Sequence, residues 1–259
     1  MKTFYRCALA CVTLAAGVFI IVPHASASTV QPLPKALAGH PLATIKDARV
    51  LLSWGPGGND PGNCVANARE IRGDAANVTL STTGVTGDCT DIQSPHEYPT
   101  VAGYVYEARM YFSNWYQWVA YWMYGNNWPF AGETDAVEAN FDANYFSYHY
   151  APCNGSASSS EYSTNPWNYD CKSTLPTHSP DIQPGWHTVD IAYGTHSVSV
   201  YYDGNLFAAV SGASVVNGAS DPSWVTFSTG SCNAEGDNEC ASGGQRSGYT
   251  EIQWLRIFT

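Results

Sequence analysis

The chain has 259 residues, of which 13% are charged and 14% are aromatic, and it contains 23 glycines and 15 prolines. Its formal net charge of −11 argues against nucleic acid and anionic membranes as partners, and it suits a neutral ligand better than a strongly anionic one. The low total charge and the many glycines, prolines and aromatics favour a compact, loop-rich, all-β domain, long enough for one sizeable sandwich core.

Residues 1–27 have the features of a secretory signal peptide. Lys2 and Arg6 precede an apolar run over residues 8–22, and residues 25–27 read Ala-Ser-Ala, a small-residue cleavage site. The run is shorter than the roughly 20 residues that a membrane-spanning helix needs, and no later segment is apolar enough to span a bilayer. We therefore expect cleavage after residue 27 and a secreted, extracellular protein. Cleavage removes two of the 11 basic residues and none of the 22 acidic ones, so the mature net charge would be −13.

The cysteines that remain after cleavage predict disulfide bonds, because exported chains meet an oxidising environment. Neighbouring cysteines bracket loops rich in Gly, Ser and Asn, which favours sequential pairing among the 15 possible connectivities. A zinc site is the weaker alternative, because no CxxC spacing occurs. The residues are Cys64, Cys89, Cys153, Cys171, Cys232 and Cys240.

The mature chain is predicted to consist of a leader and one domain. Residues 28–41 contain prolines and lack periodicity, which indicates a flexible leader. Residues 42–259 show no second linker and no internal repeat, which indicates a single domain. Within the domain, residues 77–81 and 104–112 are rich in strand-forming residues and bounded by Gly, Pro and Asp, so both are predicted strands.

Aromatic residues crowd the next segment, residues 112–129, which reads FSNWYQWVAYWMYGNNWP. In a strand with one buried face, alternate side chains enter the core and the others line the opposite face. Aromatic rings stack on the apolar faces of sugar rings, so aromatic side chains next to carboxylates suggest sugar binding. For each tryptophan in this segment, a place in the core is the alternative.

Three acidic residues follow within residues 128–141, WPFAGETDAVEANF. Strand alternation puts Glu133 and Asp135 on one face and would turn Glu138, five residues after Glu133, to the other. One extra residue near Val137, a β-bulge, would return Glu138 to the face of the other two acids. The prediction that the three carboxylates converge depends on that bulge.

Converging carboxylates suit glycoside hydrolysis, in which one protonated acid donates to the leaving oxygen and one ionised carboxylate attacks or activates water. A separation of about 5–5.5 Å between the two carboxyl groups would indicate a retaining route, and a wider one an inverting route. Three alternatives stay open at this point: solvated charges on an exposed face, calcium ligands, and a sugar-binding site without catalysis.

The last predicted elements are hairpins and a closing strand. Residues 187–207, HTVDIAYGTHSVSVYYDGNLF, contain two alternating runs around a Gly-Thr turn, and Asp203-Gly204 begins a second hairpin. Residues 249–258 are apolar on both alternations, which predicts a central strand buried on both faces. No long amphipathic helix pattern occurs, so we expect antiparallel sheets packed face to face.

These segments together resemble glycoside hydrolase family 16, the laminarinase-like enzymes with a concanavalin A-like β-jelly-roll. The family pattern ExDxxE, preceded by Trp-Pro and Gly, matches residues 128–138. Segments similar to other landmarks of the family follow in family order, so the resemblance covers roughly residues 77–258. They are YVYEARMYF, WVAYWMYG, FSYHY, GWHTVDIAYGTHSVSVYYDGNL and EIQWLRIF.

The resemblance implies an all-β jelly-roll sandwich of two antiparallel sheets. It also implies a retaining endo-hydrolase for a neutral β-glucan with β-1,3 or mixed β-1,3-1,4 linkages, with no cofactor beyond a structural calcium by fold analogy. Glu133 would be the nucleophile, Glu138 the general acid/base and Asp135 the residue that holds the nucleophile. By the same resemblance, the substrate-binding residues are Trp122, Trp128 and His149. We expect a monomer.

Two departures from the family pattern leave the substrate open. Thr134, Ala136 and Val137 replace bulkier aliphatic residues between the acids, and polar, cysteine-containing segments occupy residues 153–171 and 224–248. A non-catalytic carbohydrate-binding or cell-surface protein on the same scaffold, and a transglycosylase with identical residues, are the alternative functions.

Overall fold

The structure, a computed structural model, describes residues 43–45, 51, 54, 65–66, 71–83, 88–114, 117–126, 128, 131–140, 143–150, 171–175, 183–211, 218–230 and 247–259. The predicted signal peptide and leader lie outside these residues and stay predictions. The elements in the described part are all strands. None of its helical residues forms a helix long and apolar enough to cross a membrane.

The strands have the following bounds: β1 (Ala43–Ile45), β2 (Val65–Ala66), β3 (Ile71–Gly73), β4 (Val78–Thr82), β5 (Asp88–Gln93), β6 (Tyr98–Thr100), β7 (Val105–Phe112), β8 (Trp118–Tyr124), β9 (Glu133–Asn140), β10 (Ala143–Tyr150), β11 (Cys171–Leu175), β12 (Gly185–Gly194), β13 (Ser197–Tyr202), β14 (Asn205–Ser211), β15 (Gly218–Gly230) and β16 (Gly248–Phe258). The predicted strands at residues 77–81 and 104–112 are therefore confirmed as β4 and β7, with boundaries shifted by one residue at most ends.

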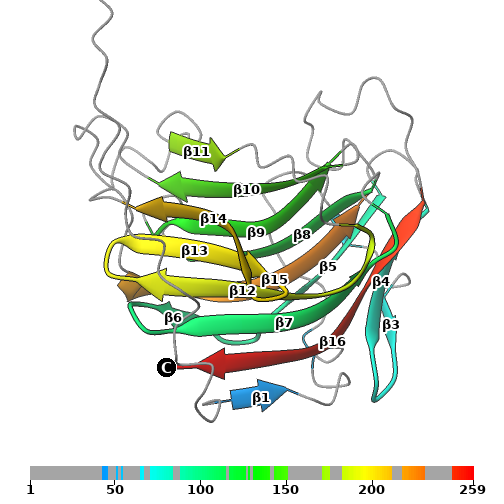
Figure 1. Cartoon of the computed structure of the whole chain (residues 1–259). Coiled ribbons are helices and arrows are strands. Elements are labelled where there is room, and N and C mark those ends of the chain that lie inside the picture. Colours follow the sequence, from blue (N-terminus) through cyan, green and yellow to red (C-terminus); the bar gives the residue numbers. More distant parts are fainter. Residues whose placement is uncertain are drawn as a thin grey trace, which may run out of the picture. The chain divides into compact units, whose positions relative to one another are not determined.

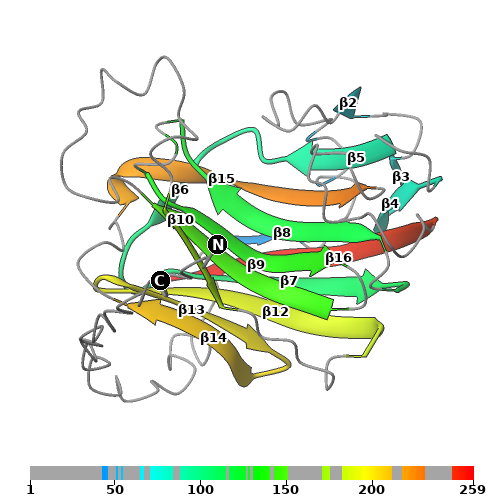
Figure 2. The ribbon, with the colours of Figure 1, turned by 90° about the horizontal axis from the view of Figure 1, so that it is seen from above.

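Within the described residues, the strands form two 8-stranded sheets (Figure 1). One sheet has the order β14-β13-β12-β7-β16-β4-β3, with β1 paired to β16, and we call it the supporting sheet. The other has the order β11-β10-β9-β8-β15-β5-β2, with β6 paired to β15, and it carries the acidic strand β9. We call it the acid-bearing sheet. Seen from above, β9 lies between its sequence neighbours β8 and β10 (Figure 2).

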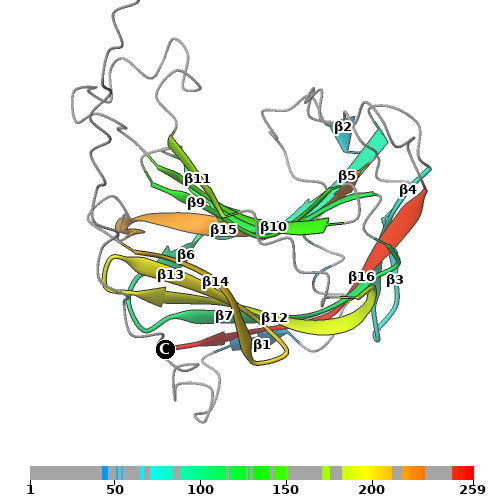
Figure 3. The ribbon, with the colours of Figure 1, turned by 45° about the horizontal axis from the view of Figure 1, so that its top comes forward.

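The hydrophobic core lies between the two sheets (Figure 3). Alternate side chains of each sheet enter it, such as Tyr106, Met110 and Phe112 from β7. A hydrogen bond also connects the two sheets: the Tyr121 hydroxyl of β8 donates to the Tyr106 carbonyl of β7 over 3.2 Å. The acid-bearing sheet is curved, and its face that points away from the core is the concave one (Figure 3). This architecture confirms the predicted jelly-roll sandwich.

Strand β16 is central, as predicted, since it lies between β7 and β4. The prediction that it is buried on both faces is wrong. Its inward residues are buried, but Trp254 and Arg256 on the outward alternation are only half-buried. The Arg256 guanidinium lies 3.9 Å from the centre of the Trp254 ring, so this apolar side chain is covered by a long charged one.

The predicted hairpins are present between β12, β13 and β14. Asp203 and Gly204 have φ values of 48° and 79°, the pair of positive angles that a type I′ turn requires. The first turn is centred one residue later than predicted, on Thr195 and His196.

Among the cysteines, Cys89 in β5 is fully buried and disulfide-bonded. The predicted connectivity falls on side chains outside the described residues and stays a prediction.

Candidate active site

Strand β9 contains the predicted β-bulge. Against β8, Tyr121 pairs with Val137 but Trp122 pairs with Asp135, so β9 has one residue more than its partner. Against β10, the pairing moves from Tyr145 with Glu138 to Ser147 with Asp135, which again leaves one extra residue on β9. Both neighbouring strands therefore place the bulge at Ala136–Val137, between the second and third acids.

With the bulge, strand β9 has one face in the core and one face that carries the acids. Thr134, Ala136 and Val137 are buried, and the latter two belong to the hydrophobic core. Glu133, Asp135 and Glu138 point to the opposite side. The residues that depart from the family pattern at the bulge are therefore packed core residues.

Thr134 ties the acidic strand to the supporting sheet. The Tyr193 hydroxyl of β12 donates to the Thr134 Oγ1 atom over 3.1 Å. Burial raises the pKa of Tyr193, so its hydroxyl stays a neutral donor across the working pH range.

Glu138 has a specific partner on the neighbouring strand. The Ser147 hydroxyl donates to its Oε2 atom, although Ser147 pairs with Asp135 in the strand register. The Glu138 carboxylate therefore reaches back along β9 toward Asp135. Ser147 is fully buried, so this hydrogen bond is shielded from water.

The other two acids meet at His149. Its Nε2 atom lies 3.5 Å from Asp135 Oδ2 and 3.7 Å from Glu133 Oε1, and all three side chains are largely buried. With Glu138 leaning in from one side and Glu133 from the other, the three carboxylates converge around Asp135. The arrangement supplies what acid/base and nucleophilic chemistry on one bond requires.

The same three groups could hold a metal ion. The ligand atoms of Glu133, Asp135 and His149 lie within 4.8 Å of one another. One imidazole and two carboxylates suit zinc better than calcium, which takes oxygen ligands. This group is therefore a poor match to the calcium-ligand alternative for the acids, and a structural calcium by fold analogy stays a prediction.

Trp122 lies on the acid-bearing face but is nearly buried. It pairs with Asp135 across the strands, is 6% exposed, and donates from Nε1 to the Ser228 hydroxyl over 2.9 Å. Its ring stacks on Tyr124, with 4.4 Å between ring centres, and Tyr124 pairs with Glu133 and is half-buried. The pair forms an aromatic wall beside the acids.

Trp128 lies beside His149, with 6.1 Å between the two ring centres. It is half-buried, so part of its surface reaches solvent next to the acids. The structure thus gathers all the predicted site residues on one face, while their roles stay predictions.

Gly132 sets the entry of the chain into β9. Its φ of 78° lies in the left-handed region that favours glycine. A Cβ atom at this position would overlap the Tyr148 hydroxyl. Glycine at this position therefore lets the backbone approach Tyr148 and enter the strand one residue before Glu133.

Sequence reasoning missed Ser147, Asn144, Tyr202 and Ser228. Strand alternation places Ser147 on the face of His149, two residues later, so Ser147 could have been found. Asn144 donates to the Tyr202 hydroxyl, and this contact joins β10 to β13 of the other sheet. No local sequence pattern predicts a hydrogen bond between two residues so far apart in the chain.

No family model and no curated protein matches the chain. Solved structures do match. A glycoside hydrolase family 16 endo-glucanase from Bacteroides ovatus has a TM-score of 0.59 at 15% identity, over 84% of this chain and 100% of that one. LamAcat from Zobellia galactanivorans has a TM-score of 0.56 at 13% identity, over 85% and 98%.

A third match carries a different description. It is an immunostimulatory antigen and pseudo beta-1,3-glucanase of Mycobacterium tuberculosis, with a TM-score of 0.53 at 16% identity over 74% of this chain and 79% of that one. At these identities the likeness concerns the fold alone. The chain has the jelly-roll fold of glycoside hydrolase family 16, as the sequence predicted.

Proposed function

We propose that the protein is a secreted, retaining endo-glycoside hydrolase that cleaves a β-glucan with β-1,3 or mixed β-1,3-1,4 linkages. The observation that carries this proposal is the bulge at Ala136–Val137, which brings Glu133, Asp135 and Glu138 to one face. Mutual repulsion makes such a cluster costly for stability, so chemistry is the better reason for it than structure.

In the proposed reaction, Glu138 donates a proton to the oxygen of the leaving sugar while Glu133 attacks the anomeric carbon. The bond from that carbon to the leaving oxygen breaks, and an ester bond to Glu133 forms. Glu138, now ionised, takes a proton from water, whose oxygen displaces Glu133 and restores both carboxyl groups. Asp135 and His149 hold Glu133 in place, and the protein needs no cofactor.

The proposed substrate is a neutral polysaccharide. The net charge of −11 would repel a strongly anionic polymer. Tyr124, which pairs with Glu133 and stacks on Trp122, and Trp128, which lies beside His149, are both half-buried and offer aromatic surface to sugar rings. One similar structure is described as an endo-glucanase and another as LamAcat, which supports a β-glucan as the first substrate to test. We propose that the protein acts as a monomer outside the cell.

A second function on the same scaffold is binding of a carbohydrate without turnover. One protein with a similar structure is described as a pseudo beta-1,3-glucanase, and this description is the observation that favours the second function. Transglycosylation is a variant of the first proposal in which a sugar hydroxyl replaces water in the second step.

The test is hydrolysis of a panel of polysaccharides by the purified mature protein. Laminarin, a mixed-linkage β-1,3-1,4-glucan and a galactan would be incubated with the wild type and with the Glu133→Gln and Glu138→Gln variants. We expect new reducing ends from a β-glucan with the wild type and a loss of at least about 1,000-fold in both variants. Retained binding of the oligosaccharide would show that the variants are folded.

Glu251→Gln is the matched control. Glu251 is a half-buried glutamate on β16 in the supporting sheet, paired with Tyr111 of β7, and its loss should leave turnover unchanged. Full activity of Glu133→Gln or Glu138→Gln would overturn the assignment. Binding to one polymer with no release from any of them would favour the non-catalytic function.

A further inference from the structure

A β-bulge creates a problem for the backbone that the acidic strand has to solve. The extra residue interrupts the ladder, so peptide groups beside it lose their regular partners. On β9 this occurs next to Ala136 and Val137, both fully buried, where a peptide group without a partner is destabilising. Other groups must therefore bond the backbone there if the bulge is to keep a single geometry.

Two side chains supply these bonds. The Glu138 backbone N–H donates to Asn144 Oδ1 over 3.1 Å, and the Tyr202 hydroxyl donates to the Ala136 carbonyl over 3.4 Å. Asn144 Nδ2 in turn donates to the Tyr202 hydroxyl, which links the two. Asn144 and Tyr202 are 2% and 5% exposed, so water does not compete for these contacts.

The bonds reach both sides of the bulge from two different sheets. Asn144 belongs to β10, where it pairs with Ala139, and Tyr202 ends β13 of the supporting sheet. Burial raises the pKa of Tyr202 well above its usual range, so the hydroxyl keeps the proton that it donates. The hydrogen bond from the Tyr202 hydroxyl is therefore independent of pH in the range in which carboxylic acids and imidazoles titrate.

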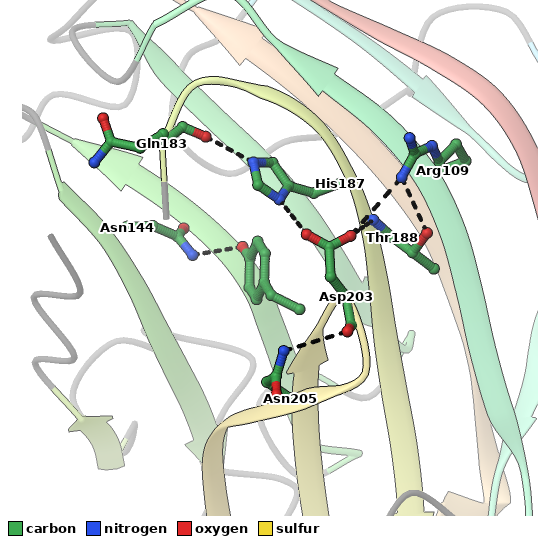
Figure 4. Close-up of polar contacts among 8 residues, drawn as sticks. Arg109, Asn144, Gln183, His187, Thr188, Asp203 and Asn205 are labelled. Atoms are coloured by element: carbon green, nitrogen blue, oxygen red, sulfur yellow. Dashed lines mark hydrogen bonds and ion pairs between the residues drawn. The ribbon is translucent and has the colours of Figure 1, made fainter. Parts of the chain in front are cut away.

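Tyr202 is itself held on the supporting sheet. Its ring packs edge-on against Phe207 and His187, with ring centres 5.0 and 6.1 Å apart. His187 contacts the Asp203 carboxylate over 2.7 Å and the Gln183 carbonyl over 2.6 Å. Figure 4 shows Asn144 and, apart from it, the contacts of His187 with Asp203 and Gln183. The ring thus has a fixed position from which its hydroxyl meets β9.

We propose that Asn144 and Tyr202 are positioning residues that lock the bulge and thereby aim the Glu138 carboxylate. Because they hold the backbone at Ala136 and at Glu138 itself, their loss lets the third acid rotate away from the other two. Neither side chain touches the substrate. The catalytic consequence rests on the proposed function, in which Glu138 is the proton donor, whereas the structural consequence does not.

The catalytic test compares two leaving groups in the Tyr202→Phe variant. A glucan oligosaccharide needs a proton on its leaving oxygen, whereas the same oligosaccharide with a dinitrophenyl leaving group does not. We expect kcat/KM on the glucan to fall by about 10-fold or more, since general acid catalysis contributes about 100-fold to 10,000-fold. For the dinitrophenyl glycoside, kcat/KM, which reports the first step alone, should change less than about threefold, whereas kcat falls because Glu138 also acts as the base of the second step.

Tyr193→Phe is the matched control. Tyr193 also reaches β9 from the supporting sheet with a buried hydroxyl, but it bonds the Thr134 side chain rather than the backbone of the bulge. Tyr193→Phe should leave the ratio of the two kcat/KM values as in the wild type. Equal losses on both substrates with Tyr202→Phe, or the same ratio in both variants, would overturn the proposal.

A second measurement needs no substrate. Amide hydrogen exchange should show faster exchange at Glu138 in Tyr202→Phe and in Asn144→Ala, while Thr134 keeps its wild-type rate. Unchanged exchange at Glu138 in the folded variants would overturn the positioning role whatever the activity. Faster exchange at Glu138 in a protein whose wild type cleaves no polymer would support the lock and reject the proposed function instead.

Discussion

Ser147 donates its hydrogen bond to the Glu138 carboxylate while facing Asp135 across the strands. The offset means that the third acid is drawn along β9 toward the other two rather than out to solvent. The convergence of the carboxylates therefore depends on a neutral hydroxyl group on the neighbouring strand as well as on the bulge.

Ser147→Ala should impair turnover rather than binding. Without the hydroxyl, Glu138 loses its partner, and we expect kcat on a β-glucan to fall by about 10-fold with KM within about twofold of the wild type. Steady-state assays of reducing ends measure both constants. Ser228→Ala is the matched control, since it removes another buried hydroxyl, the acceptor of Trp122, and should raise KM while sparing kcat. The same fall in kcat in both variants would contradict this division.

Zinc should inhibit the protein through its acids. The ligand atoms of Glu133, Asp135 and His149 lie close enough for one ion to bind all three, and such an ion would occupy the nucleophile. We expect Zn²⁺ to inhibit reversibly, EDTA to restore activity, and Mg²⁺ at the same concentration to have no effect. In a His149→Ala variant with residual activity, the zinc concentration for half-inhibition should rise by about 10-fold or more. Equal sensitivity of both proteins would locate the inhibition elsewhere.

Gly132→Ala should destabilise the entry to β9. The positive φ disfavours any side chain, and the new methyl group would overlap the Tyr148 hydroxyl. We expect the free energy of unfolding to fall by about 1–3 kcal/mol, measured by urea denaturation. Removing the hydroxyl in the Gly132→Ala/Tyr148→Phe double variant should recover part of the loss. Simple addition of the two single effects would show that the overlap is not the cause.

Asp190 should make the protein less stable as the pH rises. It is 1% exposed on β12, and burial, with smaller contributions from Glu107 and Asp203, raises its pKa from 3.8 to about 7. The native state therefore holds a proton between pH 4 and 7 that the unfolded chain releases. Stability from this group is full below about pH 4 and is lost as the pH passes through about 7, by at most about 4 kcal/mol.

Asp190→Asn tests this sign. Urea denaturation at pH 5 and pH 8 should show a smaller difference in the variant than in the wild type. Asp74 offers a control of opposite sign, because backbone hydrogen bonds from Ala76 and Asn77 lower its pKa. Its contribution is lost as the pH falls, so Asp74→Asn should not reduce the loss of stability at pH 8. An unchanged pH dependence in Asp190→Asn would contradict the assignment.

The bulge shows how far sequence reasoning reaches. The odd spacing of Glu138 from Glu133 and the need for a common face together require one extra residue, and both strand registers contain it. Such an inference works because alternation along a strand is a local property of the chain. The fold followed from the strand patterns together with the family resemblance, whereas Trp122, Trp128 and His149 were named through that resemblance alone.

What failed depends on partners that are distant in sequence. The outward side of β16 looked apolar enough to be buried, but Arg256 covers the Trp254 ring and leaves both half-exposed. Tyr202 lies 58 residues from Asn144, and only the packing of one sheet on the other brings them together. Strand alternation gives the face of a residue, and it does not give the strand that faces it across the core.

The three acids, His149 and Ser147 all belong to β9 and β10, two consecutive strands, whereas Tyr202 comes from the opposite sheet. A segment that carried only these two strands into another jelly-roll would transfer the proposed reacting groups without the tyrosine that bonds the bulge. Exchange of this chemistry between scaffolds thus requires a matching residue at the end of β13. The part of the chain that can be exchanged as a working module is larger than the part that carries the acids.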